Sequence, residues 1–426
     1  MLRRVTLGGE SGALAATAGA GDSAQPARAV LLLGIDTPIG LALVRELAGH
    51  GVAVHGIARS ARAPGLRARG LASGHCHGPR DAALLALLRD LAWQHGARHC
   101  FAVSESDIAW LNRHRECLPG LTLMMADGPR LARVLDKASV YRTAAALGIA
   151  VPQSWPIADA EAARQVPALA RYPVVVKWAD PNRVADRLRA LGLPLEKARY
   201  CHDAAELAAL LARYAPVGEY PLVQAQVPGE GMGQMLLMHE GRAVLRFEHR
   251  RLREWPPEGG TATCCESVDP DRDPALMAQS EALLRALEWS GPAMVEYRHD
   301  PASGRSVLME VNGRYWGSYP LAQQAGAHFA WTHLRLVAGL PASPAAPEPP
   351  GRQCRFLVPD TRRLLRILFA PGQIADRSRR WQAGRELWRY LVYPIGRRRG
   401  HYVFRGSDPL PCLADLIGIA RAALRR

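Results

Sequence analysis

The sequence contains no run of about 18 consecutive apolar residues, the length that a membrane-spanning helix needs. It also lacks any Cys-x-x-Cys pair, because its eight cysteines are scattered apart from the adjacent Cys264 and Cys265. No lysine or paired histidine is evident near these two residues to activate a thiol, so we interpret them as packing residues. We therefore expect no membrane span, no zinc site, no disulfide framework and a reducing, cytoplasmic compartment.

Lysine is nearly absent. The chain has only Lys137, Lys177 and Lys197, against 51 arginines. A lysine that is kept against this bias is expected to act through its compact ammonium group, which the planar fork of arginine does not imitate.

Negative charge is scarce in the last part of the chain. The formal net charge is +15, and residues 352–426 hold 17 arginines against five acidic residues, a local excess of 12. The rest of the chain is therefore close to neutral. The basic character belongs to the C-terminal region at 341–426.

Aromatic residues are interleaved with these arginines. Trp381, Trp388, Tyr390 and Tyr393 recur at spacings that fit one face of an amphipathic helix. Such a region can dock on the protein's own body, lie on an anionic membrane surface or bind nucleic acid. We favour the first two over nucleic acid.

The N-terminal part begins with a segment at 1–28 that we expect to be a disordered tail, because glycine and acidic residues interrupt it before a sustained apolar stretch forms. The next segment reads as strand, glycine turn, amphipathic helix and strand. With a helix at 81–96 and strands at 99–104 and 121–126, it predicts a doubly wound parallel domain over 29–127. The glycine turn lacks a full Gly-x-Gly-x-x-Gly pattern, so it is a weak dinucleotide signal.

The pattern changes from parallel to antiparallel further along the chain. A helix is expected to carry Asp136 and Lys137, and a strand at 172–180 has Lys177 near its end. Residues 221–254 read as strand, glycine loop, strand, turn and strand, and the alternation within 234–250 suits an antiparallel hairpin. This middle part is predicted to be α+β.

Polar residues alternate at the end of a second predicted hairpin, over 293–314. Strand side chains alternate between faces, so Glu310, Asn312 and Arg314 are expected to project together. If the hairpin closes symmetrically, Glu296 lies directly opposite Glu310, with about 4.5 to 5.5 Å between the Cβ atoms.

Two carboxylates at that separation repel each other unless a cation lies between them. Carboxylate and amide oxygens are hard ligands that Mg²⁺ prefers, and an arginine fork beside them suits phosphate oxygens. The alternative is a solvated strand face with surface ion pairs.

These residues resemble the ATP-grasp superfamily, whose pattern on this hairpin is Glu on one strand and Glu-x-Asn-x-Arg on the next. The resemblance implies that Glu296, Glu310 and Asn312 bind Mg²⁺, or Mn²⁺ in its place. It also implies that Arg314 helps to stabilise a phosphorylated intermediate.

Other landmarks of the resemblance follow in order. Lys137 and Lys177 resemble the two lysines that contact nucleotide phosphates. Gln224, Ala225, Gln226 and Val227 resemble the linker that reads adenine, and Glu230 is a candidate ribose contact. Two features depart from the pattern: the linker lacks its frequent acidic residue, and the segment at 182–194, where a glycine-rich lid is expected, holds only Gly192.

The resemblance implies a fold that is part α/β and part α+β. It consists of a Rossmann-like pre-ATP-grasp domain at 29–127, an ATP-grasp domain of two α+β lobes at 128–340 and a basic C-terminal extension. The pre-ATP-grasp domain is expected to bind no nucleotide of its own.

The implied activity is an ATP- and Mg²⁺-dependent ligase that activates a carboxylate as an acyl phosphate and joins it to an amine or amino acid. Arg250 and Arg251, with His249 and Arg253, are candidate contacts for an anionic substrate in the segment at 247–267. The expected partners are a small carboxylate and an amine, with no nucleic acid. We also consider a homodimer.

Two other functions stay open. One is a non-catalytic or regulatory module that holds Mg-ATP without transfer. The other is a protein that acts on a membrane or polyanion through its basic C-terminal region, in which case the contact would be peripheral and at the inner face of the membrane.

Overall fold

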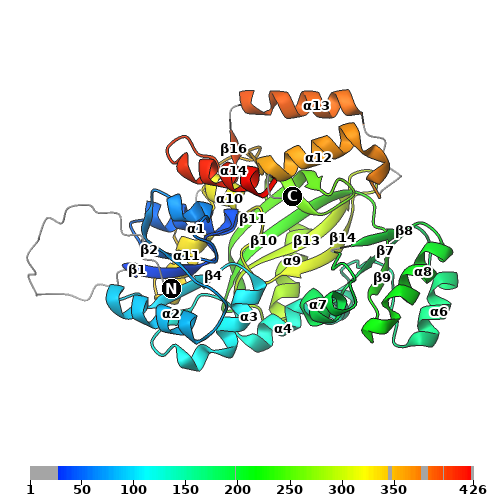
Figure 1. Cartoon of the computed structure of the whole chain (residues 1–426), viewed down its shortest axis with the longest axis horizontal. Coiled ribbons are helices and arrows are strands. Elements are labelled where there is room, and N and C mark those ends of the chain that lie inside the picture. The colour runs from blue at the N-terminus through cyan, green and yellow to red at the C-terminus, as the bar shows by residue number, and fades with distance from the viewer. Residues whose placement is uncertain (1–26, 197, 344–347, 376–381, 397, 424–426) are drawn as a thin grey trace, which may run out of the picture.

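A computed structural model describes residues 27–196, 198–343, 348–375, 382–396 and 398–423 of the 426-residue chain. The tail expected at 1–28 lies almost wholly outside the described residues. Figure 1 shows three sheets in sequence across the molecule: an N-terminal sheet, a large central sheet and a small four-stranded lobe. The predicted combination of α/β and α+β parts is confirmed.

The N-terminal sheet is parallel, with the strand order β3-β2-β1-β4-β5. All residues of β1 are buried, as expected for a sheet covered by helices on both faces. The last strand is much shorter than the predicted 121–126. The elements are β1 (Ala29–Leu33), α1 (Pro38–Gly49), β2 (Ala53–Ala58), η1 (Pro64–Arg67), β3 (Leu71–Cys76), α2 (Ala82–His95), β4 (His99–Ala102), α3 (Glu105–Arg113) and β5 (Thr122–Leu123).

Two helices, α4 (Gly128–Leu135) and α5 (Lys137–Ala146), follow this sheet. The prediction that Asp136 and Lys137 lie within one helix is wrong. The side chain of Asp136 caps α5 by accepting from the Ala138 N–H at 3.0 Å, so Lys137 is the first residue of a new helix.

The small lobe is an antiparallel sheet with the strand order β6-β9-β7-β8. The segment at 182–194 lies mostly in helix α7 and does not form a glycine-rich loop. Val184 and Leu188, four residues apart, bury one side of α7 in the core of the lobe, which favours the helix. The elements are β6 (Ser154–Trp155), α6 (Ala160–Leu169), β7 (Val174–Lys177), α7 (Pro181–Ala190), β8 (Arg199–Cys201), α8 (Ala204–Tyr214) and β9 (Leu222–Ala225).

The central sheet has the order β14-β13-β10-β11-β12-β15-β16, and its first five strands are antiparallel. The two predicted hairpins are confirmed as β10–β11 and β13–β14, whereas the sequence pattern did not predict β12. Cys264 and Cys265 on β12 are buried, and burial raises the pKa of their thiols to about 11 and about 12. Their interpretation as packing residues is confirmed. The elements are β10 (Glu230–His239), β11 (Arg242–Trp255), β12 (Thr261–Val268), α9 (Pro274–Ala286), β13 (Gly291–Asp300), β14 (Arg305–Asn312), α10 (Tyr319–Gln324) and α11 (Phe329–Val337).

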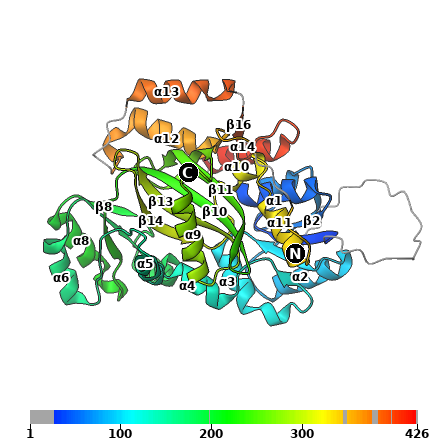
Figure 2. The ribbon, with the colours of Figure 1, turned by 180° about the vertical axis from the view of Figure 1, so that it is seen from behind.

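The C-terminal region docks on the central sheet. Strand β15 (Gln353–Arg355) pairs with β12, and β16 (Arg399–His401) pairs with β15. Helices α12 (Leu357–Phe369), α13 (Ala383–Val392) and α14 (Leu410–Ala423) gather at this end of the molecule in both Figure 1 and Figure 2. Docking on the protein's own body, one of the expected alternatives, is therefore observed.

The predicted aromatic face of this region is wrong. Trp388 is 67% exposed, whereas Tyr393 lies beyond the end of α13 and is 2% exposed. The guanidinium carbon of Arg355 lies 3.7 Å from the centre of the Tyr390 ring. Trp381 lies outside the described residues. Among the described residues, no helix combines the length and the apolar composition required to cross a bilayer.

Candidate active site

The hairpin of β13 and β14 confirms the predicted pair of glutamates, although the pairs nearer the turn are shifted by one residue from a symmetric closure. Glu296 is directly opposite Glu310, and an irregularity in the pairing follows immediately after Glu296. Asn312 ends β14, and Arg314 follows two residues later. The side chains of Glu310, Asn312 and Arg314 all line one cavity with Glu296, as strand alternation predicts.

Protein cations compensate the two carboxylates. Arg251 on β11 donates to Glu296, and the ammonium of Lys137 lies 3.6 Å from Oε2 of Glu310. The Asn312 amide donates to Oε1 of Glu310 at 3.1 Å. The two carboxylates therefore line the cavity beside Arg251 and Lys137, and they do not form the solvated strand face that was the alternative.

The cavity lies between the small lobe and the central sheet and has a volume of about 630 Å³. Its wall on the small lobe includes Lys177, at the end of β7, and the segment that follows β9. Tyr141 of α5 anchors another wall by donating to the Met309 carbonyl at 2.7 Å, and burial raises its pKa to about 12. The predicted residues that meet here are Lys137, Lys177, Gln224, Ala225, Gln226, Val227, Arg251, Glu296, Glu310, Asn312 and Arg314.

A second cavity of about 400 Å³ shares the Glu296, Glu310 and Arg314 edge. Its far side belongs to the N-terminal sheet, because Thr37 and Ser104 at the starts of α1 and α3 line it. The two cavities therefore meet at the carboxylate pair and the arginine.

His249 also lines the second cavity. Burial and the nearby Arg251 lower its pKa well below the usual value, so the ring is neutral at pH 7. Its Nδ1 lies 2.9 Å from the Ser318 hydroxyl, and its Nε2 is buried without a hydrogen-bond partner among the described residues. Gly233 on β10 is directly opposite His249 on β11 and Glu296 on β13, and its lack of a side chain leaves room for the His249 ring.

Comparison with known proteins rests on structure. Neither a protein-family model nor a curated protein matches the sequence. The biotin carboxylase domain of Hydrogenobacter thermophilus 2-oxoglutarate carboxylase, solved with MgADP and bicarbonate, aligns with a TM-score of 0.59 at 15% identity over 75% of this chain and 72% of that one. The N5-carboxyaminoimidazole ribonucleotide synthetase of Thermus thermophilus aligns with a TM-score of 0.56, at 17% identity over 76% of this chain and 81% of that one.

The L-amino acid ligase of Bacillus licheniformis aligns similarly, with a TM-score of 0.51 and 15% identity over 73% of this chain and 74% of that one. All three are ATP-grasp enzymes. The chain has the ATP-grasp fold. The recognition made from the hairpin residues is therefore confirmed at the level of the fold.

The segment predicted as an adenine linker, residues 224–227, already uses much of its hydrogen-bonding capacity. The Gln224 side chain is buried and donates to the Ser154 hydroxyl at 3.0 Å. The N–H of Ala225 donates to the Gln153 carbonyl at 2.9 Å, and that of Gln226 to the Pro173 carbonyl at 3.1 Å.

Three predicted residues do not line either cavity. The Arg250 side chain points to the opposite face of β11 and pairs with Glu266, and Glu230 is exposed at the start of β10. Arg253, after an irregularity in the strand pairing, binds the buried Asp360 instead. Successive strand residues face opposite ways, so Arg250 and Arg251 could not both enter one cavity.

Several residues of the site carried no local sequence signal. Glu105 on α3 binds Arg314, with Nε 3.0 Å from Oε1, although the two are 209 residues apart. Glu254 pairs with Arg251 at 3.0 Å, and Arg298 lies 3.8 Å from Glu254. Sequence analysis missed them because their role depends on which elements pack together.

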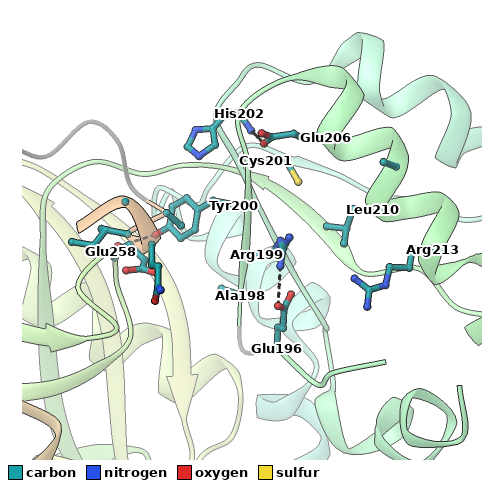
Figure 3. A pocket seen from close by; sticks show the side chains of 15 residues that line it. Glu196, Ala198, Arg199, Tyr200, Cys201, His202, Glu206, Leu210, Arg213 and Glu258 are labelled. Carbon is teal, nitrogen blue, oxygen red and sulfur yellow. Dashed lines mark hydrogen bonds and ion pairs between the residues drawn. The ribbon is translucent and has the colours of Figure 1, made fainter. Parts of the chain in front are cut away.

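A third cavity, of about 610 Å³, lies on the other side of β8 (Figure 3). Tyr200 points toward Glu258 and donates to its carbonyl at 2.8 Å, which links the small lobe to the loop before β12. Tyr200 and Glu258 line both this cavity and the one at the carboxylates, so they form part of the wall between them.

Proposed function

We propose that this chain is an ATP- and Mg²⁺-dependent ligase that phosphorylates a carboxylate to an acyl phosphate and joins it to an amine or amino acid. The observation that carries the proposal is the meeting of Glu296, Glu310, Asn312 and Arg314 with Lys137 and Lys177 in one cavity between two lobes. The ATP-grasp fold and the MgADP in the H. thermophilus domain support the choice of nucleotide.

The oxygen donors fit a magnesium ion that also binds phosphates. Two carboxylates and an amide carbonyl are hard ligands, and too few for an all-protein cage. Among the described residues, no group of three or more His, Cys, Asp or Glu side chains is placed to hold a metal. Glu296, Glu310 and Asn312 would hold Mg²⁺, or Mn²⁺, which would supply positive charge beside the transferred phosphoryl group.

The cationic side chains would position the reactants. Lys137 and Lys177 would contact the nucleotide phosphates, while Lys137 leaves its present contact with Glu310. Arg314 lies at the edge shared by both cavities, so its fork can bind the phosphoryl oxygens during transfer to the carboxylate. Glu105 would hold that fork in place through the contact at 3.0 Å.

The second cavity would hold the acceptor carboxylate and the amine. Arg251 and Arg314 supply guanidinium groups to its lining beside the carboxylates, and Thr37 and Ser104 line its far side. In the proposed reaction the carboxylate oxygen attacks the γ-phosphorus, ADP leaves, and the amine then displaces phosphate from the acyl carbon. Arg250 and Arg251 on β11 were both candidate substrate contacts, and Arg251 lines this cavity whereas Arg250 does not.

One observation favours a non-catalytic Mg-ATP-binding module as a second candidate. Helix α7 occupies most of the segment in which the fold resemblance implies a glycine-rich lid over the phosphates. A module without such a lid would bind nucleotide and transfer no phosphoryl group.

Phosphate release separates the two candidates. Purified protein would be incubated with ATP, Mg²⁺ and pools of carboxylates and amines. The ligase requires release that depends on both pools and disappears in E310Q. E266Q is the matched control, because Glu266 pairs with Arg250 on the other face of the same sheet. Tight Mg-ATP binding with no release in any pool would favour the non-catalytic module.

Assembly and location are also part of the proposal. The H. thermophilus domain was solved as a dimer, which supports testing this chain for a homodimer by light scattering. We propose a cytoplasmic location, which cell fractionation would test.

A further inference from the structure

Exposed large apolar side chains concentrate in the C-terminal region. Of the 17 such side chains among the described residues, ten follow residue 364. Single exposed apolar residues are ordinary on a protein surface, but a group of them marks a contact surface. The region also carries most of the net positive charge of the chain.

Helix α13 is amphipathic, but its apolar side faces away from the protein. A surface helix normally turns its apolar side to the core. The buried residue of α13 is Glu386, whose Oε2 lies 2.7 Å from Nη1 of Arg363 on α12. Leu387, Trp388 and Leu391 share one side of the helix and are 39%, 67% and 58% exposed.

Two arginines lie along one side of this apolar stripe. Arg385 and Arg389 are exposed on the same helix, and Arg389 lies 3.5 Å from Glu386. Helix α12, which packs against α13, adds Phe369 at 78% exposure. We call Arg385, Leu387, Trp388, Arg389 and Leu391 the outer face of α13.

We propose that the outer face of α13 binds the surface of an anionic lipid bilayer. An interfacial helix places tryptophan and leucine at the boundary between headgroups and acyl chains, while its arginines remain among the anionic headgroups. The outer face of α13 has this composition, and α13 forms the outermost edge of the molecule in Figure 1 and Figure 2. The helix would lie in the plane of the interface.

Other occupants fit the chemistry less well. A second copy of the chain would bring two regions together that each carry an excess of 12 positive charges. A nucleic acid would satisfy the arginines but would leave Leu387, Trp388 and Leu391 against a charged backbone. An anionic bilayer satisfies both the charge and the apolar stripe.

Vesicle sedimentation tests the proposal without ATP or substrates, so its outcome is independent of the ligase assay. We expect the full chain to bind vesicles of equal parts phosphatidylcholine and phosphatidylglycerol, less strongly as salt is raised, and not to bind phosphatidylcholine alone. The double variant R385Q/R389Q should lower the partition coefficient about 30-fold. The double variant W388A/L391A should lower it at least about tenfold.

W93A is the matched control, because Trp93 is 89% exposed on α2, at the opposite side of the molecule in both ribbon views. It should bind vesicles like the unaltered chain. The proposal is overturned if the unaltered chain does not bind anionic vesicles, if both vesicle types bind equally, or if W93A loses as much binding as W388A/L391A. It is also overturned if light scattering shows a dimer that W388A/L391A dissociates, because a second copy would then occupy the face.

Discussion

Replacing Asp360 with asparagine removes a negative charge from the junction between the C-terminal region and the central sheet. The Asp360 side chain is completely buried. Its Oδ1 accepts from Arg253 on β11 at 2.8 Å and from the Thr263 hydroxyl at 3.0 Å. Its Oδ2 lies 2.8 Å from Nε of Arg355 on β15. D360N keeps the shape of the side chain and leaves two guanidinium groups without their counter-charge.

The cost follows from the burial of those two groups. The side chains of Arg253 and Arg355 are 10% and 2% exposed, so water cannot replace the lost charge. Removing one partner of a buried ion pair typically costs about 3 to 5 kcal/mol. Asparagine keeps one oxygen acceptor, so we expect D360N to lower the free energy of unfolding by about 3 kcal/mol, at the low end of that range.

Urea unfolding, followed by circular dichroism and tryptophan fluorescence together, measures this loss. Coincidence of the two transitions checks that unfolding is two-state, which a free energy requires. D186N is the control, because Asp186 is 90% exposed in its pair with Arg189. Such surface pairs contribute about 0 to 1 kcal/mol. A loss in D360N no larger than that in D186N would refute the ion-pair account of this junction.

Further predictions concern the α1–α11 contact, the fork of Arg314 and the glycine between the site residues. Burial raises the pKa of Glu46 to about 7 from its ordinary 4.5. The contribution of this group to the free energy of unfolding should therefore be largest below pH 4.5 and fall by about 3 kcal/mol as the pH rises to 7. Urea unfolding midpoints should fall across this pH range, and E46Q should remove that pH dependence. R314K cannot form the forked contact with Glu105, so phosphate release should fall at least about tenfold while the melting temperature changes little; equal release would contradict the role of the fork. In G233A the new Cβ would lie 2.9 Å from Nε2 of His249 and 3.1 Å from the Met294 sulfur, so the free energy of unfolding should fall by about 1 to 3 kcal/mol. In the control G49A, in α1, the new Cβ meets no atom within 4 Å, so the free energy of unfolding should not fall.

Local patterns in the sequence were sufficient for the elements that depend on neighbouring residues. The hairpin of β13 and β14 and its Glu296–Glu310 pair were predicted from strand alternation and a short turn, whereas the one-residue irregularity between Glu296 and Tyr297 was not. The helix predicted at 81–96 is α2, which has an aspartate cap and ends at Gly96. The same alternation shows that Arg250 and Arg251 must face opposite ways, although the sequence does not tell which one meets the cavity.

The lid segment shows where a pattern from resemblance failed. The segment at 182–194 has two apolar residues four positions apart, Val184 and Leu188, and both are buried in the small lobe. Their helical spacing is a feature of the sequence itself, whereas the expectation of a glycine-rich lid came from the resemblance alone. The local apolar period determined the structure.

The sequence by itself determined the kind of site: a Glu, Asn and Arg series on one strand face, a second Glu opposite, and two of only three lysines in the chain. These depend on strand alternation and on composition, which are local properties. Only the tertiary structure decided that Glu105 holds Arg314, that Arg251 rather than Arg250 binds Glu296, and that α13 turns its apolar side outward. Each of these depends on the packing of elements that are far apart in the chain, and no local period encodes which buried side chains will meet.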